Sequence, residues 1–116
     1  MTKRRILYVT GTRADFGLMS RTLHAIDADE AFDLAVLVTG MHLSPVYGAT
    51  VNEIVEAGLK IAAEVPVDLS ISTGASMARN LGEMVIRFTD FMERERPDVV
   101  LLLGDRGEML AGAISA

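Results

Sequence analysis

The sequence has 116 residues, of which half are hydrophobic and 23% are charged, with a formal net charge of -5 and no cysteine. This length and balance predict one small globular domain with a real core. The acidic balance argues against a nucleic-acid or anionic-membrane surface, and the lack of cysteine excludes disulfides and thiolate metal sites.

Four apolar runs, rich in Val, Ile and Leu, predict β-strands. Three of them are near-continuous rather than alternating, which is typical of parallel strands that are covered on both faces. The third run is weaker because Pro66 favours an edge strand or a strand end. In chain order the four runs are 5–10, 33–39, 60–67 and 98–103.

Helical patterns lie between these runs. Phe16, Met19, Leu23 and Ile26 recur at helical spacing after the first run,. A short helix over 51–57 is closed by Gly58, and a long helix over 74–96 is ended by Pro97. The long helix carries an apolar stripe of Met77, Leu81, Met84, Val85, Phe88, Phe91 and Met92, and a last helix begins near Arg106.

The strict β-α alternation predicts a doubly wound parallel α/β sheet, Rossmann-like, with right-handed crossovers. No linker or second domain interrupts residues 1–116, so we expect a single domain. The chain ends in a helical pattern without a Gly or Pro stop signal, which predicts a truncated piece of something longer. No apolar run is long enough for a signal peptide or a membrane span, so we expect a cytoplasmic protein with no membrane partner.

Polar residues follow a glycine at the end of three predicted strands, as Gly11-Thr12-Arg13, Gly40-Met41-His42 and Gly104-Asp105-Arg106. Ligands of open parallel sheets bind outside the carboxyl ends of the strands, where the strand order reverses. A strand order of 3-2-1-4 would place Arg13 across a crevice from Asp105 and Arg106. The sequence therefore predicts a ligand site at this edge.

The stretch "GTRADFG" predicts a phosphate cradle, because glycines and a helix N-terminus favour an anion and arginine offers a planar fork. It matches neither G-x-G-x-x-G nor the P-loop pattern, which argues against NAD or P-loop chemistry. Structural roles stay open for each residue. Arg13 could pair with Asp15, Asp15 could cap the helix, Asp105 could pair with Arg106, Glu108 could complement the helix dipole, and His42 could be an ordinary loop residue.

Three motifs carry a resemblance over essentially the whole chain: "VTGTRADFG", "VTGMHLSPVYGATVNEI" and "PDVVLLLGDRGEMLAGAISA". They resemble the hydrolysing UDP-N-acetylglucosamine 2-epimerases of sialic-acid biosynthesis. The non-hydrolysing epimerases typically read "GTRPE" and "GDT", whereas Ala14-Asp15 and Arg106 here point to the hydrolysing branch. A relative that acts on a 2,4-diacetamido sugar, as in legionaminic-acid pathways, has the same motifs.

The resemblance implies a GT-B fold of two Rossmann-like domains, with this chain as the first part of the N-terminal one. It implies conversion of UDP-N-acetylglucosamine and water to N-acetylmannosamine and UDP through a glycal intermediate, without a metal or redox cofactor. Arg13 and Arg106 would contact UDP, and Gly17 would act through its backbone. Asp105 would work beside the reacting sugar, and His42, in the "TG-x-H-L" motif, would join it as a second catalytic candidate.

Two rival classes stay open. A flavodoxin-like receiver domain would carry clustered acids after the first strand, where this chain has Arg13. The N-terminal domain of a GT-B glycosyltransferase would share the fold and bind an acceptor. We expect a UDP-sugar as the partner and no nucleic acid, and a homo-oligomer is an open option. Because the second domain is missing, we expect no turnover by residues 1–116 alone.

Overall fold

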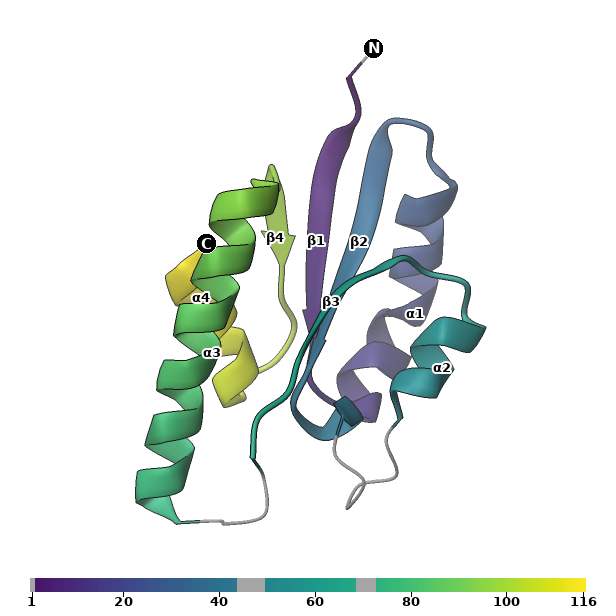
Figure 1. Cartoon of the computed structure of the whole chain (residues 1–116). Helices are drawn as coiled ribbons and strands as arrows, with labels where there is room; N and C mark the ends of the chain where they lie inside the picture. The colour runs from purple at the N-terminus through teal and green to yellow at the C-terminus, as the bar shows by residue number, and fades with distance from the viewer. Residues whose placement is uncertain (1, 44–49, 69–72) are drawn as a thin grey trace.

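The computed structural model describes residues 2–43, 50–68 and 73–116 (Figure 1). Strands and helices alternate along the chain as the sequence predicts. The strands are β1 (Arg4–Thr10), β2 (Phe32–Thr39), β3 (Ile61–Val65) and β4 (Val99–Leu101). The helices are α1 (Arg13–Ala28), α2 (Val51–Glu56), α3 (Gly74–Glu95) and α4 (Gly107–Ser115), and a 3-10 turn, η1 (Gly40–Leu43), follows β2.

The four strands form one parallel sheet in the order β3-β2-β1-β4, which confirms the predicted order. The register pairs Tyr8 of β1 with Val36 of β2 on one side and with Leu101 of β4 on the other. Strand β1 therefore lies at the centre, with the carboxyl ends of β2 and β4 beside its own. Strand β3 ends at Val65, directly before Pro66, and is an edge strand as predicted.

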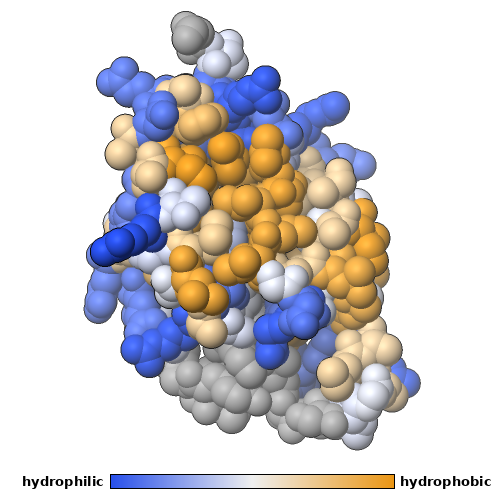
Figure 2. Space-filling view, turned by 180° about the vertical axis from the view of Figure 1, so that it is seen from behind, coloured by the Kyte–Doolittle hydropathy of each residue, from blue (hydrophilic) through white to orange (hydrophobic). Residues whose placement is uncertain are grey.

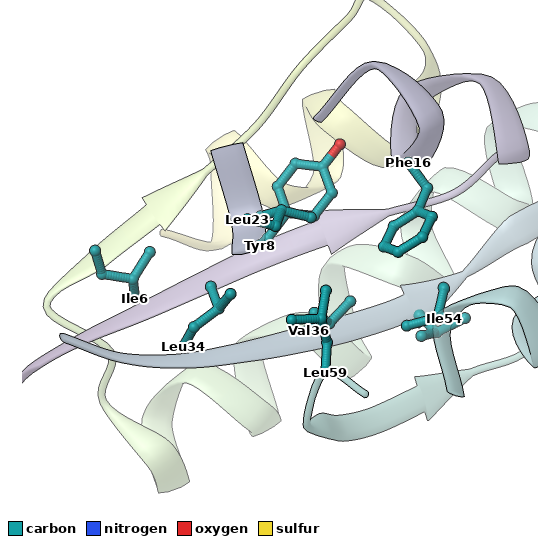
Figure 3. Packing of buried hydrophobic residues seen from close by; sticks show 9 residues of the cluster. Ile6, Tyr8, Phe16, Leu23, Leu34, Val36, Ile54 and Leu59 are labelled. Carbon is teal, nitrogen blue, oxygen red and sulfur yellow. The ribbon is translucent and has the colours of Figure 1, made fainter. Parts of the chain in front are cut away.

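Helices α1 and α2 cover one face of the sheet. Alternate residues of β1 and β2 point toward this face, and the two helices contribute apolar side chains to the same cluster,. The cluster in Figure 3 contains Ile6, Tyr8, Leu34 and Val36 from the strands, Phe16, Leu23 and Ile54 from the helices, and Leu59 from the segment between α2 and β3. This packing fixes the start of α1 over the carboxyl end of β1.

Helices α3 and α4 cover the opposite face. The predicted stripe of α3 supplies Met84, Phe88, Phe91 and Met92 to a cluster with Leu7, Val9, Leu37 and Ala111. Met77, at the N-terminal end of that stripe, is 66% exposed, so the stripe joins the core only from its second turn onward. The helix ends at Glu95, and Arg96 closes it in the left-handed conformation before Pro97.

Strand β4 differs from the prediction of a strand covered on both faces. It spans only three residues at an edge of the sheet, and Val99 is 40% exposed. An edge strand has a neighbour on one side only, so its apolar side chains are only partly covered.

Figure 2 shows apolar residues gathered on the face of the molecule opposite to the one seen in Figure 1. Within the described ranges, no helix is both long and apolar enough to cross a membrane.

Replacing Phe88 with alanine should lower the free energy of unfolding by about 3–5 kcal/mol, the usual cost of emptying a buried phenylalanine site. Phe88 is fully buried between α3 and the sheet. The control is Met77→Ala on the same helix, which should stay within about 0.5 kcal/mol because Met77 is exposed,. Denaturant unfolding measures both values, and equal losses would contradict the assigned core.

Candidate functional site at the carboxyl edge of the sheet

The ends of β1 and β2 meet one buried side chain, that of Glu108 in the first turn of α4, the helix that follows β4. A Cβ atom at Gly11, after β1, would lie 2.7 Å from Cγ of Glu108. A Cβ atom at Gly40, after β2, would lie 2.8 Å from Oε1 of Glu108, and Gly40 also has a φ of +62°. A side chain at either position would force Glu108 to shift, and at Gly40 it would also strain the left-handed backbone,. This contact joins the ends of β1 and β2 to the segment that follows β4.

The start of α1 is closed by the carboxylate of Asp15. Its Oδ2 accepts hydrogen bonds from the amides of Gly11 at 3.1 Å and Thr12 at 2.8 Å. The hydroxyl of Thr12 accepts in turn from the Asp15 amide at 3.2 Å, which completes a capping box,. The capping role considered for Asp15 is thus confirmed.

The capping box bears on the phosphate-cradle hypothesis. An anion close to Gly11 or Thr12 would compete with Asp15 for their amides, and the buried carboxylate places a negative charge there,. The spacing Thr12-x-x-Asp15 already has the pattern of a capping box in the sequence,.

The two candidate arginines pair with glutamates, not with the aspartates considered from the sequence. Arg13 is 74% exposed, and its Nε lies 3.1 Å from Oε1 of Glu53 on α2. The Nε of Arg106 lies 3.2 Å from Oε2 of Glu108, whose side chain is only 6% exposed. The glutamate that pairs with Arg106 is buried, whereas the glutamate that pairs with Arg13 is exposed.

Asp105 and Gly17 lie in different surroundings. Asp105 is exposed, between the end of β4 and the start of α4. Gly17 is exposed within α1, the fifth residue of that helix, with open space where a side chain would lie. Its amide follows the four free N–H groups at the helix start, so it is not free to donate to a ligand as expected. The position instead leaves open space where a side chain would lie.

His42 is fully buried beneath the edge, with both ring nitrogens engaged. Its Nε2 lies 2.8 Å from the hydroxyl of Thr10, and its Nδ1 lies 2.8 Å from the hydroxyl of Thr50. Thr10 donates its proton to Asp15, a carboxylate that only accepts,. The Thr10 oxygen must then accept from His42, which assigns the proton to Nε2 and leaves Nδ1 to accept from Thr50.

The hydrogen bonds of His42 favour a positioning role over contact with a substrate. They tie η1 and the start of α2 to the end of β1 through Thr10 and Thr50. Tyr8 strengthens the same network, since its hydroxyl donates to Asp15 at 2.8 Å. Burial raises the pKa of Tyr8 above its usual range, and the hydrogen bond to Asp15 raises it further, so the phenol stays protonated,.

Protonation of His42 should weaken the fold. Burial lowers the pKa of His42 in the folded state, more than nearby carboxylates raise it,. The unfolded chain therefore takes up the proton first, and the free energy of unfolding should fall as the pH drops below about 6.5, by at most about 1.4 kcal/mol per pH unit. Urea unfolding at pH 7.5 and 5.5 measures the change.

Two variants separate the histidines. His42→Gln should lose most of this pH dependence, whereas His24→Gln, at an exposed histidine of α1, should keep it. The same pH dependence in the parent and in His42→Gln would contradict the assignment.

Sequence reasoning missed the central place of Glu108. A glutamate in the first turn of a helix is common, because it complements the helix dipole. One signal was available: a glycine at the end of a strand suggests a close neighbour, and at Gly11 and Gly40 that neighbour is Glu108. Within the described residues, no cluster of His, Asp and Glu has the arrangement of a metal site.

The fold and this edge define a class of protein, the Rossmann-like parallel α/β domains with a polar site where the strand order reverses,. Residues 24–116 match the sequence model of the UDP-N-acetylglucosamine 2-epimerases. The chain belongs to this family, which confirms the resemblance drawn from the three motifs.

Two curated relatives and one solved structure illustrate the match. The chain is 54% identical over 97% of its length to a hydrolysing UDP-N,N'-diacetylbacillosamine 2-epimerase of Legionella pneumophila, of which it covers 30%. It is 38% identical, again over 97% of its length, to a hydrolysing GDP/UDP-N,N'-diacetylbacillosamine 2-epimerase of Campylobacter jejuni, of which it covers 29%. A Listeria monocytogenes structure described as a UDP-N-acetylglucosamine 2-epimerase superimposes with a TM-score of 0.83 over 99% of this chain and 29% of that one, at 20% identity. The chain thus spans about a third or less of the length of the proteins it matches.

Proposed function

We propose that this chain is part of the N-terminal domain of a GT-B enzyme that hydrolyses a UDP-linked 2-acetamido sugar with inversion at C2. The observation that carries the proposal is the convergence of three strand ends at one edge, in a chain of the epimerase family. That edge holds two cations, Arg13 and Arg106, and an exposed carboxylate, Asp105.

The residues divide between the two parts of such a substrate. Arg13 and Arg106 bind the diphosphate, which is present in the substrate and in the released UDP alike. Asp105 acts at the sugar, where the proton on C2 leaves and a glycal forms. Water then adds at C1 and a proton returns to C2 from the other face, which yields UDP and the free 2-epimer. The pyrophosphate link itself stays intact.

For the sugar, we propose a 2,4-diacetamido sugar such as that of UDP-N,N'-diacetylbacillosamine. The 54% identity to the Legionella pneumophila enzyme with that substrate in its name supports this choice over the simple N-acetylglucosamine expected from the motifs. UDP-N-acetylglucosamine is the second candidate, because the matching family is named for it. A nonulosonic-acid pathway, of which sialic acid is one product, would use either free 2-epimer.

The test uses the intact protein, by which we mean the natural polypeptide that carries this chain. It is incubated in turn with UDP-N,N'-diacetylbacillosamine, UDP-N-acetylglucosamine and GDP-N,N'-diacetylbacillosamine, and the free sugar and nucleotide are followed by NMR. We expect the highest kcat/KM with the first. Faster turnover of UDP-N-acetylglucosamine would make that sugar nucleotide the preferred substrate. If none of the three substrates releases its nucleotide, the proposed reaction is refuted.

A further inference from the structure

We propose that Glu108 is a positioning residue that orients Arg106 toward the diphosphate of the substrate, an inference that rests on the proposed function. Glu108 contacts the arginine through Nε, at 3.2 Å. The guanidinium group has its remaining N–H donors on the two Nη atoms. A contact at Nε fixes the plane of the group and leaves those donors for a ligand.

The burial of Glu108 strengthens its hold on Arg106. Glu108 is buried and packs closely against Gly11 and Gly40, where even a Cβ atom would collide with its side chain. A buried carboxylate is stable only when a cation or hydrogen-bond donors compensate its charge, so Glu108 favours conformations of Arg106 that keep this pair. The position in the first turn of α4 adds a favourable helix dipole,.

Arg13 provides an internal comparison. Glu53 also contacts its arginine through Nε, at 3.1 Å, but the side chain of Glu53 is 40% exposed. Water competes for an exposed pair, and such pairs fix a side chain only weakly. We therefore expect Glu108 to fix the orientation of Arg106 strongly, and Glu53 to fix that of Arg13 only weakly.

The experiment measures binding of UDP and of uridine to the intact protein by calorimetry. Glu108→Ala should weaken UDP binding about 10-fold and leave uridine binding within 2-fold, because uridine has no phosphate. Glu53→Ala, the matched control, should change UDP binding less than 3-fold. Glu108→Gln keeps an oxygen that can accept from Nε and should recover most of the affinity.

A double-mutant cycle identifies the partner. In the Arg106→Ala background, Glu108→Ala should have almost no further effect on UDP binding if Glu108 acts through Arg106. An equal loss in both backgrounds would overturn the proposal, as would a parallel loss of uridine binding, which indicates damage to the fold. Tighter UDP binding by Glu108→Gln would also overturn it, since the carboxylate would then act by repelling phosphate.

A second measurement does not depend on the proposed function. The Nε–H of Arg106 should give a distinct NMR signal that exchanges slowly with water in the parent and in Glu53→Ala, and rapidly in Glu108→Ala. Slow exchange that persists in Glu108→Ala would refute the positioning role. If the parent protein does not bind UDP while this signal behaves as expected, the proposed function fails and the pairing of Glu108 with Arg106 stands.

Discussion

Asp105→Asn in the intact protein should lower kcat by about 10²-fold or more, the usual scale for the loss of an acid–base group, while the Kd for UDP stays within a few-fold. Asp105 lies exposed between β4 and α4, beside the arginine that Glu108 holds. We propose that it acts on the sugar, where protons move only during the reaction. A group with that role contributes to the transition state and not to binding of the released nucleotide.

Steady-state rates and calorimetry with UDP measure the two quantities. Asp90→Asn, at an exposed aspartate of α3, is the control and should change neither. Circular dichroism checks that the asparagine variant is folded. A normal kcat for Asp105→Asn would show that another group carries the chemistry, and a matching loss of UDP affinity would move Asp105 to the diphosphate.

Arg13→Ala should weaken binding of UDP by about 10- to 150-fold, which corresponds to the roughly 1.5–3 kcal/mol of a hydrogen bond to a charged group. The diphosphate is present in substrate, transition state and product alike, so KM should rise with little change in kcat. Arg13 is anchored only at the surface by Glu53, and its guanidinium group can turn toward a ligand without disturbing the core.

The control for Arg13 is Arg21→Ala, at an exposed position further along α1. This variant removes the same charge from the same helix at a distance from the strand ends, so it should bind UDP as the parent does. Equal affinity of Arg13→Ala and the parent would remove Arg13 from the site. A lower kcat at unchanged UDP affinity would instead place Arg13 among the groups that act only in the transition state.

The fold follows from local patterns. Continuous Val, Ile and Leu runs predict buried parallel strands, Pro66 predicts the end of the third strand, and Gly58, with a φ of +77°, ends α2 as expected. The strand order follows as well, because polar residues after glycine at three strand ends suggest that these ends meet. What the pattern missed is that β4 is short and partly exposed at the edge of the sheet.

The partners of the site residues were not predictable in the same way. Arg13 reaches Glu53, forty residues along the chain, only because α1 and α2 pack on the same face of the sheet. His42 lies beneath the edge, where it bonds to Thr10 and Thr50, and the capping role of Asp15 is the exception that the sequence did indicate. A sequence shows which residue types lie near an edge, but the choice of partner depends on tertiary packing.

The most direct test of the proposed function follows where solvent atoms go during the reaction. The intact protein reacts with UDP-N,N'-diacetylbacillosamine in deuterated, 18O-labelled water. The proposed reaction breaks the C1–O bond, so the oxygen between C1 and phosphorus leaves with UDP. Mass spectrometry should find UDP free of 18O, and NMR should find a free sugar with inverted configuration and one deuterium at C2. Incorporation of 18O into UDP, or a free sugar that keeps its configuration and proton at C2, would contradict the proposed function.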